Sequence, residues 1–373
     1  MEFYGQKSDL LKELELVQGA VEKKGTIPIL SHVLLETADF NVRISATDLE
    51  LGARSNCSAK VKTPGVATVP ARRVLEIVRS LPDREVHFKL LENHSVQVTC
   101  ERSTFKLVGL AKDNFPALPP VPKAKAEVPA GILAGLVEKT SFAVSEAESR
   151  FTLNGALLSL KAGSVKMVAT DGHRLTLAER KHATADLAPE LSLLIPKRAL
   201  SNLRRVLSEA AEEANVQIAS DEKHIFFAVG DRLLISRMIA GTFPNYEAVL
   251  PRENNKLLEL DTDQVRAAVR RVALLASEQS NGVRLLLEKD RLEIASSGGE
   301  YGEAMEILDA RNDHEPVKIG FNYRYLVDFF GVLNQGSRIS MALKDDQSAV
   351  EFRPIEEPTG WEYRYVVMPL RLG

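Results

Sequence analysis

The chain has 373 residues, 45% of them hydrophobic and 27% charged, a composition typical of a globular protein of two to three domains. Its net charge of −3 excludes a protein that is basic over its whole surface, although a small basic face on a larger acidic body fits this charge. Two isolated cysteines exclude a disulfide framework, and no apolar run approaches the ~20 residues that span a bilayer, so we expect a cytoplasmic protein without a membrane partner.

The first part of the chain predicts a helix followed by two strands. Four apolar residues recur at helical spacing: Leu10, Leu14, Val17 and Val21. Residues 33–35 and 42–46 are apolar stretches separated by a polar turn. The second stretch alternates apolar and polar side chains, which indicates a half-buried strand that ends in Ala46-Thr47-Asp48.

The same order of elements recurs twice. A helix over residues 132–137 precedes strands over 156–160 and 165–168, and the second strand ends in Ala169-Thr170-Asp171. A third helix carries Val265, Val269 and Val272 and precedes strands over residues 283–287 and 292–295. The copies recur at intervals of about 125 residues, which indicates a repeated domain.

Each copy also has a similar second half, in which a strand enters a leucine-rich helix. The entry points are Val69-Pro70-Ala71, Ile195-Pro196-Lys197 and Ile319-Gly320-Phe321. We expect Pro70 and Pro196 in the first helical turn, where a missing amide proton costs nothing. Helices over residues 74–81, 200–207 and 326–333 follow, and hairpins come after them, such as 225–229 with 233–237.

These repeats predict an α+β protein of three repeated domains, each with two helices packed on antiparallel sheets. The expected boundaries are 1–122, 123–251 and 252–373. The linkers would lie at residues 116–122 and 251–255.

Familiar catalytic motifs are absent from the sequence. It has no phosphate-binding loop, no nucleophile elbow and no zinc-protease helix, and its seven histidines lack ligand spacing, so we expect no metal and no cofactor. One cluster has a catalytic composition, because Asp171 could act as a base beside His173 and Arg174 in a hydrolase. The alternative, which we favour, is that Asp171-Gly172 is a structural turn and that Arg174 lies on the surface.

Basic residues gather on the predicted helices. Lys197 and Arg198 precede Arg204 and Arg205 by seven residues, which puts both pairs on one helical face. Similar positions on other helices carry Arg72, Arg73, Arg266 and Arg270. These charges are either ordinary solvated helix faces or one composite basic surface that meets a phosphate backbone without reading its sequence.

The chain resembles the family of bacterial DNA polymerase III beta subunits, the sliding clamps, along its full length. The motifs that carry the resemblance are Thr26-Ile27-Pro28-Ile29-Leu30, Thr47-Asp48-Leu49-Glu50, Val69-Pro70-Ala71-Arg72, Leu153-Asn154-Gly155, the stretch from Ala169 to Leu175, Phe243-Pro244-Asn245-Tyr246, Val249-Leu250-Pro251 and the stretch from Val366 to Leu372.

The resemblance implies a non-catalytic processivity factor. Two chains would join head to tail into a ring of six domains that encircles double-stranded DNA without reading its sequence. The implied partners are the clamp loader, the replicative DNA polymerase III alpha subunit, other polymerases and repair proteins. A monomeric DNA-binding scaffold is the alternative among non-catalytic functions.

The resemblance also implies a hydrophobic cleft between the second and third domains that binds partner peptides. Its expected residues are Leu153, Thr170, Gly172, His173, Arg174, Leu175, Pro244, Val249, Val366, Val367, Met368, Pro369, Leu370 and Arg371. Ala248 departs from the arginine that is common at its position in the family.

Two further sets of residues follow from the resemblance and from the basic helices. The expected DNA-binding residues are Lys24, Arg72, Arg73, Arg150, Lys197, Arg198, Arg204, Arg205, Arg266 and Arg270. The expected dimer interface joins two edge strands through Phe105 and Leu107 against Leu274 and Leu275, with Arg73 and Arg102 facing Glu300, Glu303 and Glu306.

Overall fold

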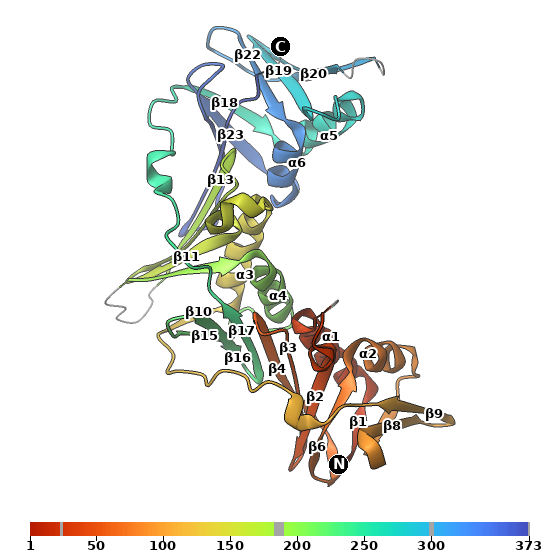
Figure 1. Cartoon of the computed structure of the whole chain (residues 1–373). Coiled ribbons are helices and arrows are strands. Elements are labelled where there is room, and N and C mark those ends of the chain that lie inside the picture. Colours follow the sequence, from red (N-terminus) through yellow and green to blue (C-terminus); the bar gives the residue numbers. More distant parts are fainter. Residues whose placement is uncertain (23–24, 183–189, 298–301, 372–373) are drawn as a thin grey trace. The chain divides into compact units, whose positions relative to one another are not determined.

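The computed structural model describes residues 1–22, 25–182, 190–297 and 302–371 (Figure 1). It divides into two compact units. The first unit is Met1–Ala134 with Arg198–Met238, and the second is Gly135–Lys197 with Ile239–Gly373. Each unit consists of antiparallel sheets with a few helices packed on them, so the predicted α+β class is confirmed.

The first unit contains α1 (Lys7–Val17), α2 (Ala71–Ser80) and all but the first residue of α4 (Lys197–Ser208). Its larger sheet has the strand order β10 (Ala126–Pro129), β15 (Asn215–Ser220), β16 (His224–Val229), β17 (Arg232–Arg237), β4 (Leu51–Ser58), β3 (Asn41–Thr47), β2 (His32–Ala38) and β6 (Gly65–Pro70). Its smaller sheet has the order β5 (Lys60–Thr63), β1 (Glu2–Gln6), β7 (Glu85–Leu90), β8 (Ser95–Cys100) and β9 (Ser103–Val108).

The second unit contains α5 (Thr262–Val272), α6 (Tyr323–Gly331) and the later part of α3 (Ala130–Thr140). Its larger sheet has the order β14 (Leu191–Pro196), β11 (Gly155–Lys161), β12 (Ser164–Thr170), β13 (Arg174–Lys181), β25 (Trp361–Val367), β24 (Val350–Pro354), β23 (Arg338–Leu343) and β18 (Lys256–Asp261). Its smaller sheet has the order β21 (Glu303–Asp309), β20 (Arg291–Ser297), β19 (Gly282–Glu288) and β22 (Val317–Asn322).

The predicted repeat is confirmed in the order of its helices and strands, but each half has three strands where the sequence patterns predicted two. A helix leads into the strand triplets β2–β3–β4, β11–β12–β13 and β19–β20–β21, and a second helix leads into β7–β8–β9, β15–β16–β17 and β23–β24–β25. The larger sheets join neighbouring repeats, because β17 pairs with β4 and β25 pairs with β13. Each compact unit is therefore built around a sheet that two repeats share.

The prediction for the two prolines was wrong. Pro70 and Pro196 are the last residues of β6 and β14, and the helices begin one residue later. Pro70 pairs with His32 and Pro196 pairs with Gly155 in the strand ladder. Both strands lie at the edge of their sheet, where a residue without an amide proton leaves no ladder bond unmade.

Candidate docking site and basic helices

The turn from β12 to β13 is held by its own side chains. The Asp171 carboxylate accepts the amide protons of His173 at 2.9 Å and Arg174 at 3.0 Å. The Thr170 hydroxyl donates to the Arg174 carbonyl and accepts the amide proton of Gly172. Gly172 has φ +91°, a backbone conformation that suits glycine. The predicted structural turn is confirmed.

The first repeat contains the same turn between β3 and β4. The Asp48 carboxylate accepts the amide protons of Glu50 and Leu51, and the Thr47 hydroxyl bonds the Leu51 carbonyl. Leu49 has φ +76° where the second repeat has glycine. The turn therefore belongs to the repeat itself, whereas the His173–Arg174 pair is particular to the second repeat.

The prediction that Arg174 lies on the surface was wrong, because its side chain is only 9% exposed. Its guanidinium pairs with Asp171 at 3.0 Å and with Asp328 of α6 at 2.7 Å, and it donates to the Phe142 carbonyl at 2.8 Å. It also lies over the Tyr325 ring, 4.4 Å from the centroid. Arg174 thus fastens the turn to α6.

The surroundings of Arg174 keep it charged. Burial alone would lower the pKa of Arg174, but Tyr365, Asp328 and Asp171 together raise it above its usual value. Both Asp171 oxygens are occupied by backbone amides and by Arg174. A general base needs an oxygen directed at a substrate, so this geometry does not favour the hydrolase hypothesis.

An apolar cluster lies beside this turn. Its buried members are Leu153, Val168, Leu175, Leu177, Leu194, Phe243 and Val366, and the half-buried Tyr246 and Leu250 pack against them. Strand pairing brings the turn and the C-terminal segment together, because Leu175 pairs with Val366 and the Met368 amide donates to the His173 carbonyl at 2.9 Å. Among the large apolar residues predicted for the cleft, Val249 is 48% exposed and Met368 is 44% exposed.

The predicted cleft residues differ in what they offer to a ligand. Gly172, His173, Pro244, Val249, Met368 and Arg371 are exposed, and Thr170, Pro369 and Leu370 are half-buried. Leu153, Leu175 and Val366 form a buried floor. Val367 is fully buried and follows Val366 in the strand, so it points to the opposite face of the sheet. The sequence prediction omitted Phe243 and Tyr246, although both lie in a motif that carries the resemblance.

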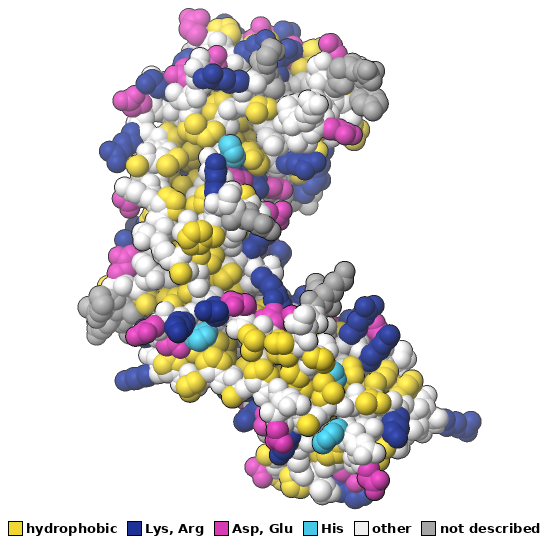
Figure 2. Space-filling view, in the orientation of Figure 1, with side chains coloured by type: hydrophobic (Ala, Val, Ile, Leu, Met, Phe, Trp, Pro, Cys, Tyr) yellow, Lys and Arg dark blue, Asp and Glu magenta, His cyan; other side chains and the backbone are white. Residues whose placement is uncertain are grey.

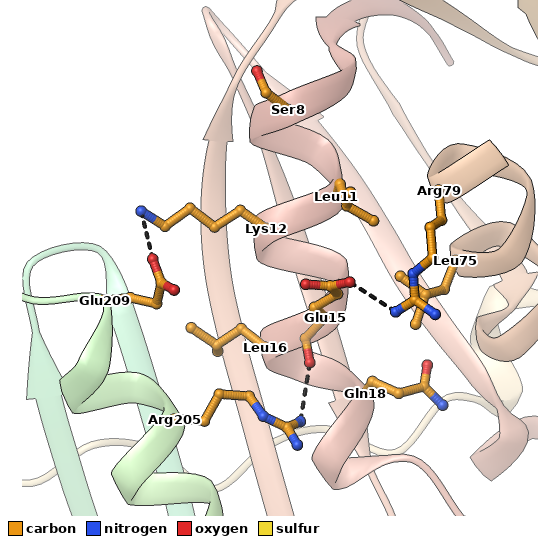
Figure 3. Close-up of a pocket in the computed structure, with 10 residues that line it drawn as sticks. All are labelled: Ser8, Leu11, Lys12, Glu15, Leu16, Gln18, Leu75, Arg79, Arg205 and Glu209. Carbon is orange, nitrogen blue, oxygen red and sulfur yellow. Dashed lines mark hydrogen bonds and ion pairs between the residues drawn. The ribbon is translucent and has the colours of Figure 1, made fainter. Parts of the chain in front are cut away.

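A second candidate surface lies on the helices of the first unit. A pocket of about 540 Å³ is lined by α1, α2 and α4 (Figure 3). Ion pairs cross it from Lys12 to Glu209 at 2.8 Å and from Arg79 to Glu15 at 2.7 Å, and Arg205 donates to the Glu15 carbonyl. The pocket is therefore of mixed charge.

Many predicted DNA-binding residues already have acidic partners. Arg72 and Arg73 both pair with Glu76, Lys197 pairs with Glu146, and Arg198 pairs with Asp48. Arg150 donates to the Asp171 carbonyl, and Arg270 is exposed on α5. Lys24 lies outside the described residues. Exposed ion pairs are weak, about 0–1 kcal/mol, so a phosphate can compete for the basic partner.

The visible face of the molecule mixes charges of both signs with hydrophobic side chains (Figure 2). Among the described residues, no group of three His, Cys, Asp or Glu side chains could hold a metal ion. In the same part of the chain, no helix is long and apolar enough to cross a membrane.

Sequence comparison covers almost the whole chain. Residues 1–119, 127–245 and 247–371 match the N-terminal, central and C-terminal domains of the DNA polymerase III beta subunit. The chain belongs to the DNA polymerase III beta subunit family. The beta sliding clamp of Pseudomonas aeruginosa is 34% identical over 100% of both chains, and that of Caulobacter vibrioides is 35% identical over 98% of this chain and 99% of its own.

Solved structures of the family agree with the fold. The sliding clamp from Pseudomonas aeruginosa bound to griselimycin matches with a TM-score of 0.91 at 33% identity, over 100% of both chains. The Caulobacter crescentus beta sliding clamp, with PEG bound to its putative beta-motif tethering region, matches over 100% of both chains with a TM-score of 0.89 at 34% identity.

Of the residues predicted at the dimer interface, Phe105 and Leu107 lie on the edge strand β9, but Leu274 and Leu275 lie in the short 3-10 helix that follows α5 (Ala273–Leu275) and not on an edge strand, so that part of the prediction was wrong. Phe105 is half-buried and Leu107 is buried on β9, whereas Leu274 is 82% exposed and Leu275 is half-buried. Glu306 of β21 pairs with Arg271 of the same chain. An ion pair between Glu306 and a second chain would therefore replace an internal one.

The other charged residues of the predicted interface are of two kinds. Arg102 and Glu303 are exposed, and Arg73 already pairs with Glu76. Glu300 lies outside the described residues.

Proposed function

We propose that this chain is a non-catalytic DNA sliding clamp: two copies close head to tail into a ring that encircles duplex DNA and tethers the replicative polymerase. The proposal rests on one observation: the strand pairing that joins neighbouring repeats is left open at the first repeat and at the third. It is supported by membership of the beta sliding clamp family.

Strand pairing joins the last strand of one repeat to the first half of the repeat before it, and this pattern leaves two edge strands with no neighbour on their outer side. The last strand of the second repeat (β17) pairs with β4 of the first, and the last strand of the third (β25) pairs with β13 of the second. The last strand of the first repeat is β9, and the counterpart of β4 and β13 in the third repeat is β21. Both lie at the edge of their sheets. A second copy that joins β9 to β21 twice would close six repeats into a ring and cover both edges.

The proposed domains are 1–122, 123–251 and 252–373, so each repeat is one domain although the sheets run across the junctions. Contacts from Arg72, Arg150, Lys197, Arg204, Arg266 and the other basic residues would go to phosphates, which carry no base sequence. Sliding follows, because such contacts form equally well at every step along the duplex.

The apolar cluster with exposed Val249 and Met368 is the proposed docking site. The related clamp from Pseudomonas aeruginosa is bound to griselimycin, which supports a ligand site in this family. Short apolar peptides of the clamp loader, the DNA polymerase III alpha subunit, other polymerases and repair proteins are the proposed ligands. A flexible methionine at such a site suits several different partners.

The topological function predicts that retention depends on DNA ends. After loading by a clamp loader, the protein should stay on a nicked circular plasmid during gel filtration and should be lost when a restriction enzyme linearises it. The reason is that the ring is held by enclosure and not by affinity. Equal retention on circular and linear DNA would contradict the proposal and favour the monomeric scaffold.

The head-to-tail dimer predicts a native mass of about twice the 41.1 kDa of one chain. The substitution Leu274→Arg should reduce the mass toward that of a monomer, because it brings a charge into the proposed interface. Analytical ultracentrifugation at micromolar concentration measures this mass. Phe40→Arg is the matched control, since Phe40 is 81% exposed but lies in the turn between β2 and β3. If Leu274→Arg and the wild type sediment alike, the interface is wrongly assigned.

A further inference from the structure

A pocket of about 500 Å³ lies on the smaller sheet of the second unit. The side chains of Val283 and Leu285 on β19 are buried, and the helices α5 and α6 pack against this sheet. Arg284 lies between them in the strand and points to the opposite face, where Ala295 and Met305 are its neighbours across the ladder. The pocket therefore opens on the face of the sheet that the helices leave uncovered.

Among the described residues that line this pocket, cations outnumber carboxylates. They are Arg284, Lys318 and Arg371, with one described carboxylate, Glu303. Within the described ranges, neither Lys318 nor Arg371 has an ion-pair partner. Basic residues without an ion pair are unusual in this chain of net charge −3, because most of the basic residues described above are paired.

Arg284 is only partly satisfied by the protein. Its Nη2 donates to Glu293 at 3.1 Å, but its Nε is buried and has no hydrogen-bond partner within the described part of the chain. A buried donor without a partner costs about 1–3 kcal/mol, so native proteins usually satisfy it. An anion in the pocket would neutralise Lys318 and could pair with the exposed part of the Arg284 guanidinium, because that side chain is 38% exposed.

The pocket is close to the docking site along the chain. Arg371 follows Met368 by three residues, which span at most about 11 Å of extended chain. The intervening Leu370 amide donates to the Gly320 carbonyl of β22 at 2.8 Å, so the segment is tied to the sheet that carries the pocket. A partner peptide that covers Met368 would reach the pocket with a few further residues.

We propose that this pocket binds acidic side chains of a partner peptide, next to the apolar residues that occupy the docking site. This inference rests on the proposed docking function. Arg and Lys at the pocket match carboxylates, and Ala295 and Met305 offer an apolar floor to their methylene groups. None of the described residues that line the pocket is aromatic and able to stack on a base, which favours a peptide over single-stranded nucleic acid. Strand addition at β21 uses the edge of the sheet, whereas Arg284 and Lys318 lie on its face; Glu303, which lines the pocket, also belongs to the predicted dimer interface.

The test uses the full-length protein and a fluorescent hexaglutamate peptide, with hexaglutamine as the neutral comparison. Fluorescence anisotropy at low salt should detect hexaglutamate only, and added salt should weaken its binding. Lys318→Gln should weaken hexaglutamate binding about threefold to fivefold, as expected for the loss of one exposed charge contact. Lys318→Arg should restore it.

The matched control is Lys289→Gln, which removes an exposed lysine from the turn between β19 and β20 of the same sheet. Equal affinity of the wild type and Lys318→Gln, or equal weakening by Lys289→Gln, would overturn the proposal. Oligothymidylate and unlabelled hexaglutamate are compared as competitors of the fluorescent peptide. If oligothymidylate displaces it at the lower concentration, the proposal is overturned and the pocket binds nucleic acid instead. Griselimycin binding to the wild type is measured in parallel. Its absence would count against the docking site, whereas the hexaglutamate result decides the pocket.

Discussion

We expect the substitution Glu13→Gln to lower the free energy of unfolding of the first unit by about 3 kcal/mol or more. Glu13 on α1 is only 7% exposed. It accepts hydrogen bonds from Arg232 Nη2 at 2.6 Å, from Arg232 Nε at 3.1 Å and from the Ser55 hydroxyl. Its hydrogen bond raises the pKa of Arg232. Glutamine would leave the half-buried guanidinium without its hydrogen-bonded counter-charge, with only the more distant Glu209 and Asp231 nearby, and such a loss is costly.

Urea denaturation followed by circular dichroism measures this effect. Glu15→Gln is the matched control on the same helix, because the pair of Glu15 with Arg79 is exposed and contributes less than about 1 kcal/mol. The double substitution of Glu13→Leu with Arg232→Met should recover most of the lost stability, since it removes both charges together. Equal losses in Glu13→Gln and Glu15→Gln would contradict the interpretation of a buried pair.

The second large effect is expected for Arg174→Met. The substitution keeps an unbranched apolar side chain but leaves Asp171, Asp328 and the Phe142 carbonyl without their common donor. We expect the free energy of unfolding of the second unit to fall by about 3 kcal/mol. The turn beside the proposed docking site would no longer be fastened to α6. If that site binds griselimycin as the related Pseudomonas aeruginosa clamp does, its affinity should fall by about tenfold or more, which corresponds to about 1.4 kcal/mol.

Arg180→Met on the same strand is the control for Arg174→Met. Arg180 bonds the Thr359 carbonyl at the surface, so its loss should cost less than about 1 kcal/mol and leave griselimycin affinity unchanged. Urea denaturation and isothermal titration calorimetry give the two measurements. An unchanged unfolding midpoint would show that Arg174 is not structural. A destabilised variant with full griselimycin affinity would separate the turn from the docking site.

Local periodicity was enough to predict the helices and two of the three strands in each half of a repeat, but not the third strand. The spacing of Leu10 and Leu14 corresponds to the buried face of α1, and the alternation of Val42, Ile44 and Ala46 corresponds to β3. These patterns are local, because the period of a helix or a strand is written in consecutive residues. The turn at Asp171 was also predictable, since its hydrogen bonds join residues within four positions.

The burial of Arg174 could not be predicted from local sequence. Its partners Phe142 and Asp328 are 32 and 154 residues away along the chain. The pair of Glu13 with Arg232 is separated by 219 residues, and no spacing rule connects them. Pro70 and Pro196 show the opposite failure. Proline favours the first turn of a helix, but here the strand ladder extends one residue further and includes both prolines.

The two unpaired edges have opposite charge, because exposed Arg102 and Lys106 lie next to or on β9, whereas Glu303 lies on β21. Opposite charges on paired strands attract, which favours the joining of β9 of one copy to β21 of the other. In the proposed ring this relates the copies by a rotation about the axis of the hole, which leaves the two sides of the ring different. Both Met368 segments then face the same side. The two faces of a loaded ring would therefore differ, and partners that bind the Met368 segments would approach from one face only.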